Sequence, residues 1–394
     1  MWGIAAQASS SATNLILSIF AGRALGPGGL GVVFIGFAAL QVVQALVRSV
    51  LIQPLVAHAA ARPKAERELF SGVGVTVVAL VGVGATAAFA AVSVAAGNSS
   101  LREAFLLFLP WVVPSILHEL WKAVLFQEGK GARAAASDAV RLVIMVGAAP
   151  LALGSSSYEL VTIWGIASVC ALAFVIVSYR IRPRRPQSAI VAWRDAGWEL
   201  GRWLGARELA FQTSAYATTM ILALVIGTTG VGGLRSAEVL FSPFSFVAAA
   251  LAFPALPMVA RAAGHSSEAA RHLAFRLSAV ATAFGLAYFV GMIISRSWLL
   301  PLVFGSEFEP FESLVWPMGT AQLFHSAGFG FVLWLTASRR GRAAFENGLL
   351  WAVSNLTAAT ALAVAFGTTG AAWGMTIAAA AAALAAIAVA LRRG

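Results

Sequence analysis

The sequence predicts an all-α polytopic membrane protein of about twelve transmembrane helices in two six-helix lobes. Of its 394 residues, 60% are hydrophobic and only 11% are charged. A soluble domain carries roughly 25% charged residues, because polar groups must cover its surface. Apolar segments of membrane-spanning length and a one-sided distribution of basic residues support the same prediction.

A helix needs about 20 apolar residues to cross the hydrocarbon layer. Twelve segments have this length, and short Gly/Ser/Thr/Pro turns or charged loops separate them. The segments are 2–21, 31–57, 70–96, 104–126, 134–153, 159–179, 206–227, 236–257, 273–294, 314–336, 343–366 and 371–391.

The basic residues assign an orientation to these segments. With a cytoplasmic N-terminus, the cytoplasmic side holds twenty of the 27 lysines and arginines. The twenty are Arg62, Lys64, Arg67, Lys130, Arg133, Arg180, Arg182, Arg184, Arg185, Arg194, Arg202, Arg207, Arg261, Arg271, Arg276, Arg339, Arg340, Arg342, Arg392 and Arg393. The outer loops hold four: Arg23, Arg102, Arg235 and Arg296. Because cytoplasmic loops are enriched in basic residues, we expect a multi-pass protein of the cytoplasmic membrane with both termini in the cytoplasm.

Internal similarity predicts a six-plus-six duplication. QPLVAHAA at 53–60 matches LPMVARAA at 256–263, GARAAASD at 131–138 matches GRAAFEN at 341–347, and Trp164-Gly165 matches Trp373-Gly374, in the same order. Two halves of six spans enter the membrane from the same side, so a pseudo-two-fold axis along the membrane normal should relate them. The predicted lobes are 1–187 and 188–394, joined by a basic cytoplasmic linker at about 180–202. The linker is either a surface amphipathic helix or an ordinary loop.

Two motifs resemble a known family. AGRALGPGGLGVV at 21–33 looks like the signature after the first span of polysaccharide export proteins. GTTGAAWGMTIA at 367–378 looks like the motif that opens their last span. With the twelve spans, the chain resembles the Wzx-like flippases of the multidrug/oligosaccharidyl-lipid/polysaccharide (MOP) exporter superfamily.

This resemblance implies a central cavity, alternating access and translocation of an oligosaccharide carried on a polyprenyl diphosphate, for surface polysaccharide biosynthesis. It implies a transporter rather than an enzyme, with no cofactor. The expected partners are the lipid-linked substrate, the bilayer, and a polysaccharide polymerase or glycosyltransferases, with no nucleic acid. We expect a monomer.

Ionisable residues within spans are candidates for binding the diphosphate. Arg48 offers a fixed charge and five donors that suit phosphate, or it extends toward the cytoplasmic face. His118, Glu119 and Lys122 lie within one helical turn, so Lys122 either meets the diphosphate or forms a Glu–Lys pair between helices.

The first span carries a polar stripe at helical spacing, formed by Gln7, Ser11, Asn14 and Ser18. The stripe either binds sugar hydroxyls, chiefly through Gln7 and Asn14, or consists of small residues for close helix packing.

Four further residues complete the candidate site. Gln41 and Gln44 add a polar pair in the second span. His325 occupies the place in the second half that corresponds to His118, and either lines the cavity or bonds to a neighbouring helix. Arg207 lies at the start of the seventh span, where it is either a substrate ligand or a membrane anchor.

Other functional classes receive less support. Aspartate occurs only at Asp138 and Asp195, both expected near the cytoplasmic face, and there is no Asp-x-Asp pair, metal-ligand cluster or Walker loop. A cation-coupled multidrug exporter of the same superfamily needs embedded carboxylates, for which Glu119, Glu208 and Glu238 are the candidates. A membrane enzyme would need catalytic carboxylates in a sizeable outer loop, and the loop with Glu307 is short.

Overall fold

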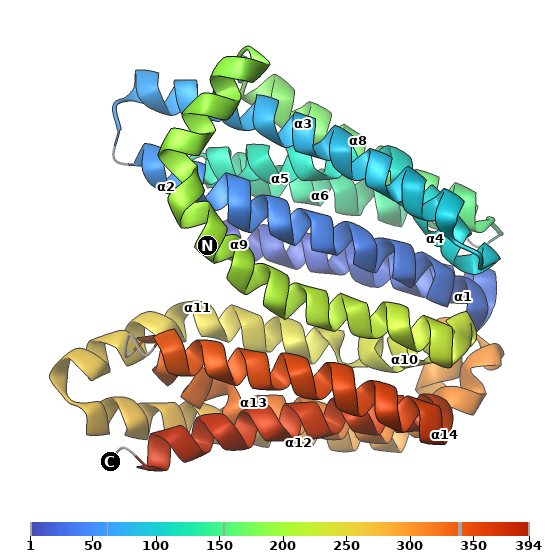
Figure 1. Cartoon of the computed structure of the whole chain (residues 1–394). Coiled ribbons are helices and arrows are strands. Elements are labelled where there is room, and N and C mark those ends of the chain that lie inside the picture. Colours follow the sequence, from blue (N-terminus) through green and yellow to red (C-terminus); the bar gives the residue numbers. More distant parts are fainter. Residues whose placement is uncertain (1, 61, 153, 338–340, 393–394) are drawn as a thin grey trace. The chain divides into compact units, whose positions relative to one another are not determined.

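The computed structural model describes residues 2–60, 62–152, 154–337 and 341–392. Within these ranges it leaves out the side chains of residues 57, 60, 196–197, 199–201, 203–213, 215, 249–250, 252–254, 256–257, 260, 264, 337 and 341. The described residues form helices and no strand (Figure 1).

The helices of the first half are α1 (Trp2–Leu46), a π-helix (Val47–Ile52), α2 (Gln53–Ala60), α3 (Lys64–Ala95), α4 (Ser99–Phe108), a 3-10 turn (Leu109–Trp111), α5 (Val112–Gln127), α6 (Gly131–Gly147), α7 (Ala149–Ala152) and α8 (Ser157–Ser178). Those that follow are α9 (Pro186–Val225), α10 (Gly227–Leu240), α11 (Ser242–His265), α12 (Ser267–Phe304), a 3-10 helix (Ser306–Leu314), α13 (Val315–Ala337) and α14 (Gly341–Arg392).

The all-helical membrane class is confirmed, but the segments are joined differently from the prediction. Six helical stretches of the described chain are long and apolar enough to cross a membrane. Two of them each contain two predicted segments: α1 is broken at Gly26, with φ 66°, and α14 at Gly367, with φ 62°. Glycine adopts this left-handed conformation without a Cβ penalty, so it turns the chain sharply without an intervening loop.

The chain forms two compact units. Unit 1 contains Met1–Leu25 and Val32–Tyr216, and unit 2 contains Gly26–Gly31 and Ala217–Gly394. The lobe boundary predicted at residue 187 falls inside α9, which begins at Pro186. Proline is favoured at the first helical position, because its missing N–H has no intrahelical partner there.

An aromatic contact joins three helices of unit 1. The ring of Phe37 lies 6.1 Å from that of Phe108 and 5.9 Å from that of Trp164, in α1, α4 and α8 respectively. All three side chains are buried. At Gly36 a Cβ would collide with the carbonyl oxygen of Ala104, so glycine permits this close approach of α1 to α4.

A π-helical turn interrupts the second half of the first long stretch. Pro54 has no N–H to donate to the carbonyl of Val50, so the regular hydrogen-bond pattern fails at this position. The N–H of Gln53 instead bonds to the carbonyl of Arg48, five residues earlier. Such turns occur frequently at functional sites, and this one carries Arg48.

An ion pair fixes the end of unit 1 where α3 begins and α5 ends. Arg67 Nε donates to Glu128 Oε1 at 2.7 Å, and Arg67 Nη2 approaches Glu128 Oε2 at 3.3 Å. This hydrogen bond from Arg67 lowers the pKa of Glu128, so the carboxylate stays ionised at neutral pH. Bidentate geometry of this kind gives a stronger contact than a single bond.

Unit 2 is held by close packing of α11 to α14. Its core cluster includes Val259, Phe331, Trp334 and Leu335. Gly330 lets α13 approach α12 so closely that its N–H bonds to Ser278 Oγ at 2.9 Å. Lipid provides no hydrophobic driving force between helices. Small residues at such crossings instead stabilise the helix pair by allowing close packing and interhelical hydrogen bonds.

The glycine-rich signature of the sequence has a packing role within unit 2. A Cβ at Gly31 would collide with the carbonyl oxygen of Thr228, and a Cβ at Gly232 would collide with that of Pro27. Segment 26–31 and α10 therefore touch backbone to backbone through reciprocal glycines.

We predict that Gly31→Ala or Gly232→Ala destabilises the purified protein by about 1–3 kcal/mol, because the added methyl group forces two backbones apart. The control is Gly28→Ala, whose Cβ would lie an ordinary 3.5 Å from Thr229 Oγ1. Thermal unfolding in detergent measures the effect. Equal melting temperatures for all three variants would contradict the packing role.

Candidate functional site

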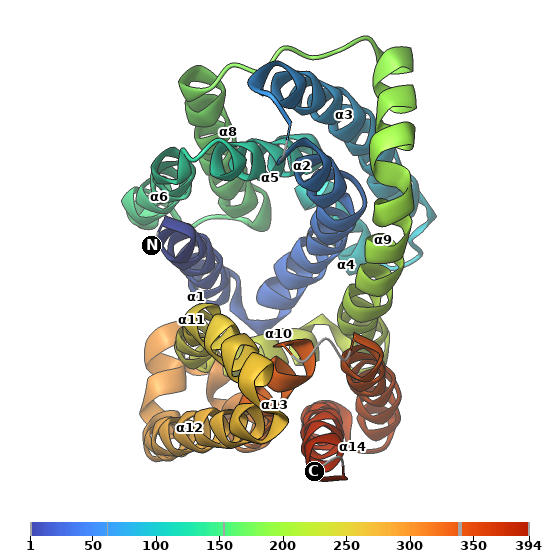
Figure 2. The same ribbon diagram turned by 90° about the vertical axis from the view of Figure 1, so that its left-hand side faces the viewer.

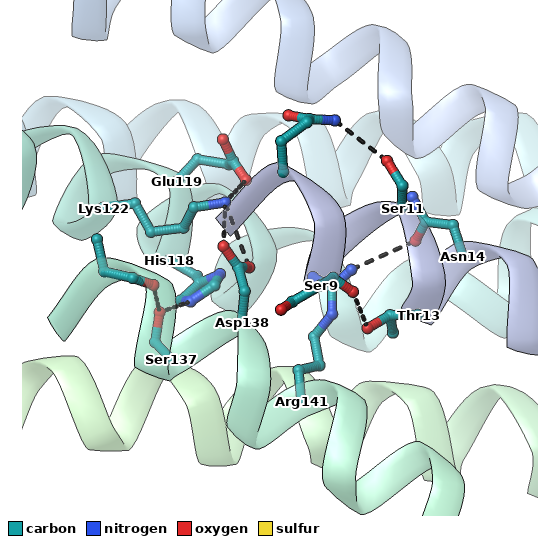
Figure 3. A network of polar contacts seen from close by, with 12 residues as sticks. Ser9, Ser11, Thr13, Asn14, His118, Glu119, Lys122, Ser137, Asp138 and Arg141 are labelled. Carbon is teal, nitrogen blue, oxygen red and sulfur yellow. Dashed lines mark hydrogen bonds and ion pairs between the residues drawn. The ribbon is translucent and has the colours of Figure 1, made fainter. Parts of the chain in front are cut away.

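Lys122 lies between two carboxylates inside unit 1 (Figure 3). Its Nζ is 3.3 Å from Glu119 Oε1 and 3.0 Å from Asp138 Oδ2. The side chain of Lys122 is 14% exposed, and that of Asp138 is fully buried. A buried carboxylate is stable as an ion only beside a cation, so the Lys122–Asp138 pair constrains how α5 and α6 pack.

Helical spacing explains why these groups meet. His118, Glu119 and Lys122 lie on one side of α5, while Ser137 and Asp138 lie on the facing side of α6. His118 Nε2 is 3.0 Å from Ser137 Oγ, and both side chains are buried. Two polar contacts, one a hydrogen bond and one an ion pair, therefore join α5 to α6.

Arg48 lies at the exposed end of the cluster. Its Nε is 3.9 Å from Glu119 Oε2, longer than a hydrogen bond. The Arg48 side chain remains 49% exposed. Glu119 thus connects Arg48 to Lys122, while Arg48 keeps donors available to another group.

Arg141 adds a third cation on the same side of α6 as Asp138. Its Nη2 donates to Asn14 Oδ1 of α1 at 3.3 Å, and its guanidinium lies 5.5 Å from the ring centroid of Trp164. The Nε of Arg141 is buried and has no hydrogen-bond acceptor among the described residues. Figure 3 shows Arg141 directed toward Asn14.

We call these groups the cationic cluster: Arg48, Glu119, Lys122, Asp138 and Arg141. It contains three cations and two carboxylates, without counting His118, and so carries one positive charge in excess. In a medium of low dielectric constant, such an excess strongly favours an anion nearby.

The polar stripe of the first span contributes one contact to the cluster. Gln7 is exposed and donates to Ser11 at 3.3 Å within its own helix. Ser18 is buried and donates to the carbonyl of Asn14. The contact of Asn14 with Arg141 joins α1 to α6. The stripe's role toward a sugar stays a prediction.

The remaining candidates lie outside this network. Gln44 is buried and Gln41 half-buried in α1. His325 belongs to α13 of unit 2, where its side chain is exposed. The side chain of Arg207 lies outside the described residues.

The sequence interpretation missed two members of the cluster. It placed Asp138 near the cytoplasmic face without a role, and it gave Arg141 none. The structure pairs Asp138 with Lys122 and brings Arg141 to Asn14. The three-residue spacing of Asp138 and Arg141, which puts opposite charges on one helix face, was the available signal.

We predict that Lys122→Met destabilises the protein by about 3–5 kcal/mol, because it leaves Asp138 buried without its cation. The double variant Lys122→Met/Asp138→Leu should recover part of this loss, with an interaction energy of about 0.5–3 kcal/mol. Thermal unfolding of wild type, both single variants and the double variant gives the cycle. Lys64→Ala, which removes an exposed pair with Glu68, is the control. Simple additivity of the two single effects would contradict the coupling.

Solved structures with a similar fold are membrane transporters. An inward-facing multidrug resistance MATE family transporter of the MOP superfamily aligns with a TM-score of 0.79 at 14% identity, covering 98% of this chain and 94% of that one. The lipid II flippase MurJ, in an inward closed conformation, aligns with a TM-score of 0.79 at 12% identity, covering 98% and 87%. No family model matches the sequence, and no curated protein does. The chain therefore has the fold of MOP-superfamily transporters, a fold shared by multidrug exporters and a lipid-linked flippase.

Proposed function

We propose that this protein flips a polyprenyl-diphosphate-linked oligosaccharide across the cytoplasmic membrane by alternating access, as a step in surface polysaccharide biosynthesis. The observation that carries the proposal is the excess of cations over carboxylates in the cationic cluster. The fold supports a transporter, because it is shared with a lipid II flippase and with multidrug transporters.

A sugar–diphosphate head cannot enter hydrocarbon alone, since its charges and hydroxyls would lose water without replacement. A transporter must supply substitute partners along the path. Arg48 fits this role, because it is half exposed and only loosely held by Glu119. A guanidinium presents donors in a planar fork that matches phosphate oxygens.

Lys122 has a different role in this proposal. Both of its carboxylate neighbours are within 3.3 Å, so its charge is largely compensated inside unit 1. Lys122 keeps Glu119 and Asp138 from repelling the substrate, and Arg48 and Arg141 provide the positive potential. The cluster then supplies one net positive charge, and Arg48 is its exposed phosphate ligand.

A cation-coupled multidrug exporter is the second candidate. Its specific support is the presence of two carboxylates among the helices of unit 1, one of them fully buried. Protonation of Asp138 would release Lys122 and couple a proton to rearrangement of α5 against α6. Because each carboxylate already has a cationic partner, we rank this second.

The cellular setting belongs to the same proposal. Both termini lie in the cytoplasm, and the protein works as a monomer beside a polysaccharide polymerase or glycosyltransferases that build and consume its substrate.

Reconstituted vesicles provide the test. A polyprenyl-diphosphate-linked oligosaccharide with a fluorescent sugar is incorporated, and its movement is followed by quenching with a membrane-impermeant reductant. We predict that Arg48→Gln slows translocation by about ten- to a hundred-fold, since a hydrogen bond to a charged group contributes about 1.5–3 kcal/mol. Arg48→Lys should be intermediate, because it keeps the charge and loses the fork.

The matched control is Arg102→Gln, which removes an exposed arginine at the start of α4. It should flip at the wild-type rate. Uptake of an organic cation driven by a proton or sodium gradient, in vesicles that do not flip the lipid, would instead establish the exporter.

A further inference from the structure

An apolar pocket of about 460 Å³ lies in unit 1, and no member of the cationic cluster is among its lining residues. Its walls come from the π-helical turn and the end of α1, from α3, and from the first turns of α9. The lining residues are Leu46, Val47, Val50, Leu51, Val77, Leu80, Val81, Ile190 and Trp193. A pocket of this size and composition suits a hydrocarbon chain.

A basic segment adjoins the pocket. We call residues 180–185, between α8 and α9, the arginine strap; it contains the exposed Arg180, Arg182, Arg184 and Arg185. None of these four side chains forms an ion pair with a carboxylate in the part of the chain that the structure describes. The strap therefore presents four positive charges that remain available to an anion.

The strap is fixed to α3 at the edge of the pocket. Thr76 Oγ1 accepts from the N–H of Arg184 at 2.9 Å and donates to its carbonyl at 2.8 Å. Val77, the next residue of α3, lines the pocket. Figure 2 shows the strap leaving α8, passing the end of α3 and entering α9.

The C-terminal end of the strap is followed directly by α9, which forms part of the pocket wall. α9 begins at Pro186, and Ile190 lies four residues on, about 6 Å along the helix axis. Trp193, one turn further, lines the pocket, and its indole N–H is buried without an acceptor among the described residues. Buried indole N–H groups ordinarily find a partner.

We propose that this pocket and strap bind an anionic glycerophospholipid of the bilayer, with an acyl chain in the pocket and the phosphate on the strap. Charge complementarity selects the occupant, because basic groups at the ends of membrane helices attract anionic head groups. An ester carbonyl near the head group would accept from Trp193. The site is separate from the transported substrate and does not depend on its identity.

The test is lipid binding to the purified full-length protein, measured by native mass spectrometry. Phosphatidylglycerol and phosphatidylcholine with identical acyl chains are titrated in parallel. Phosphatidylglycerol should bind more tightly. The double variant Arg184→Gln/Arg185→Gln should weaken its binding by about 30-fold, the equivalent of about 1 kcal/mol for each arginine near an anionic surface.

A second variant tests the acyl chain independently. Val81→Phe narrows the pocket and should weaken phosphatidylglycerol binding severalfold, whereas Val83→Phe, at an exposed position of the same helix outside the pocket, should not. Arg261→Gln/Arg276→Gln removes two exposed arginines of unit 2 and serves as the charge control.

Equal binding of the two phospholipids by the wild type would overturn the proposal. So would an equal loss in the charge control, or unchanged binding in Val81→Phe. Displacement of phosphatidylglycerol from the strap-dependent site by an equimolar polyprenyl phosphate would assign the site to an isoprenoid lipid instead.

Discussion

The buried ion pair of Lys122 with Asp138 is the constraint on which the rest of unit 1 depends. A carboxylate with no exposed surface must be neutralised or paired, and among helices in lipid no water takes the partner's place. Pairing fixes the rotation of α5 against α6. That rotation in turn directs Glu119 toward Arg48 and leaves Arg141 on the α1 side, where Asn14 meets it. The position of the excess positive charge therefore follows from a packing requirement, and the proposed affinity for diphosphate follows from the excess itself.

The two units solve the problem of helix packing by the same physical means. Lipid gives no hydrophobic drive between helices, so close approach must supply dispersion contacts and hydrogen bonds. Gly36 in unit 1 and Gly330 in unit 2 each admit a neighbouring backbone where a Cβ would collide. In the repeat identified in the sequence, the matched segments begin helices in both halves: α6 begins at Gly131 and α14 at Gly341. Trp164 and Trp373 differ, since the first is buried and the second 43% exposed.

Local chemistry made much of the fold predictable, and tertiary packing limited the prediction of the site. Composition and segment length are enough for an all-helical membrane chain, because lipid leaves few alternatives. The left-handed break at Gly26 and the pairing of Glu119 with Lys122 follow from neighbours in sequence. The contacts of Arg48 with Glu119 and of Lys122 with Asp138 depend on which helices pack together, which periodicity does not determine. The π-helical turn at Arg48 had a signal in Pro54, whose missing N–H disrupts the preceding turn.

Equilibrium binding of the head group tests the central claim most directly, without a translocation step. Purified protein is titrated with a short-chain polyprenyl diphosphate and, separately, with a lipophilic organic cation, for wild type and for Arg48→Gln. If the excess positive charge of unit 1 binds the substrate's diphosphate, the polyprenyl diphosphate binds and the organic cation does not compete with it. Arg48→Gln then weakens diphosphate binding by about tenfold or more, which corresponds to about 1.4 kcal/mol or more. Tight binding of the cation, with diphosphate affinity absent or insensitive to Arg48, would contradict the account.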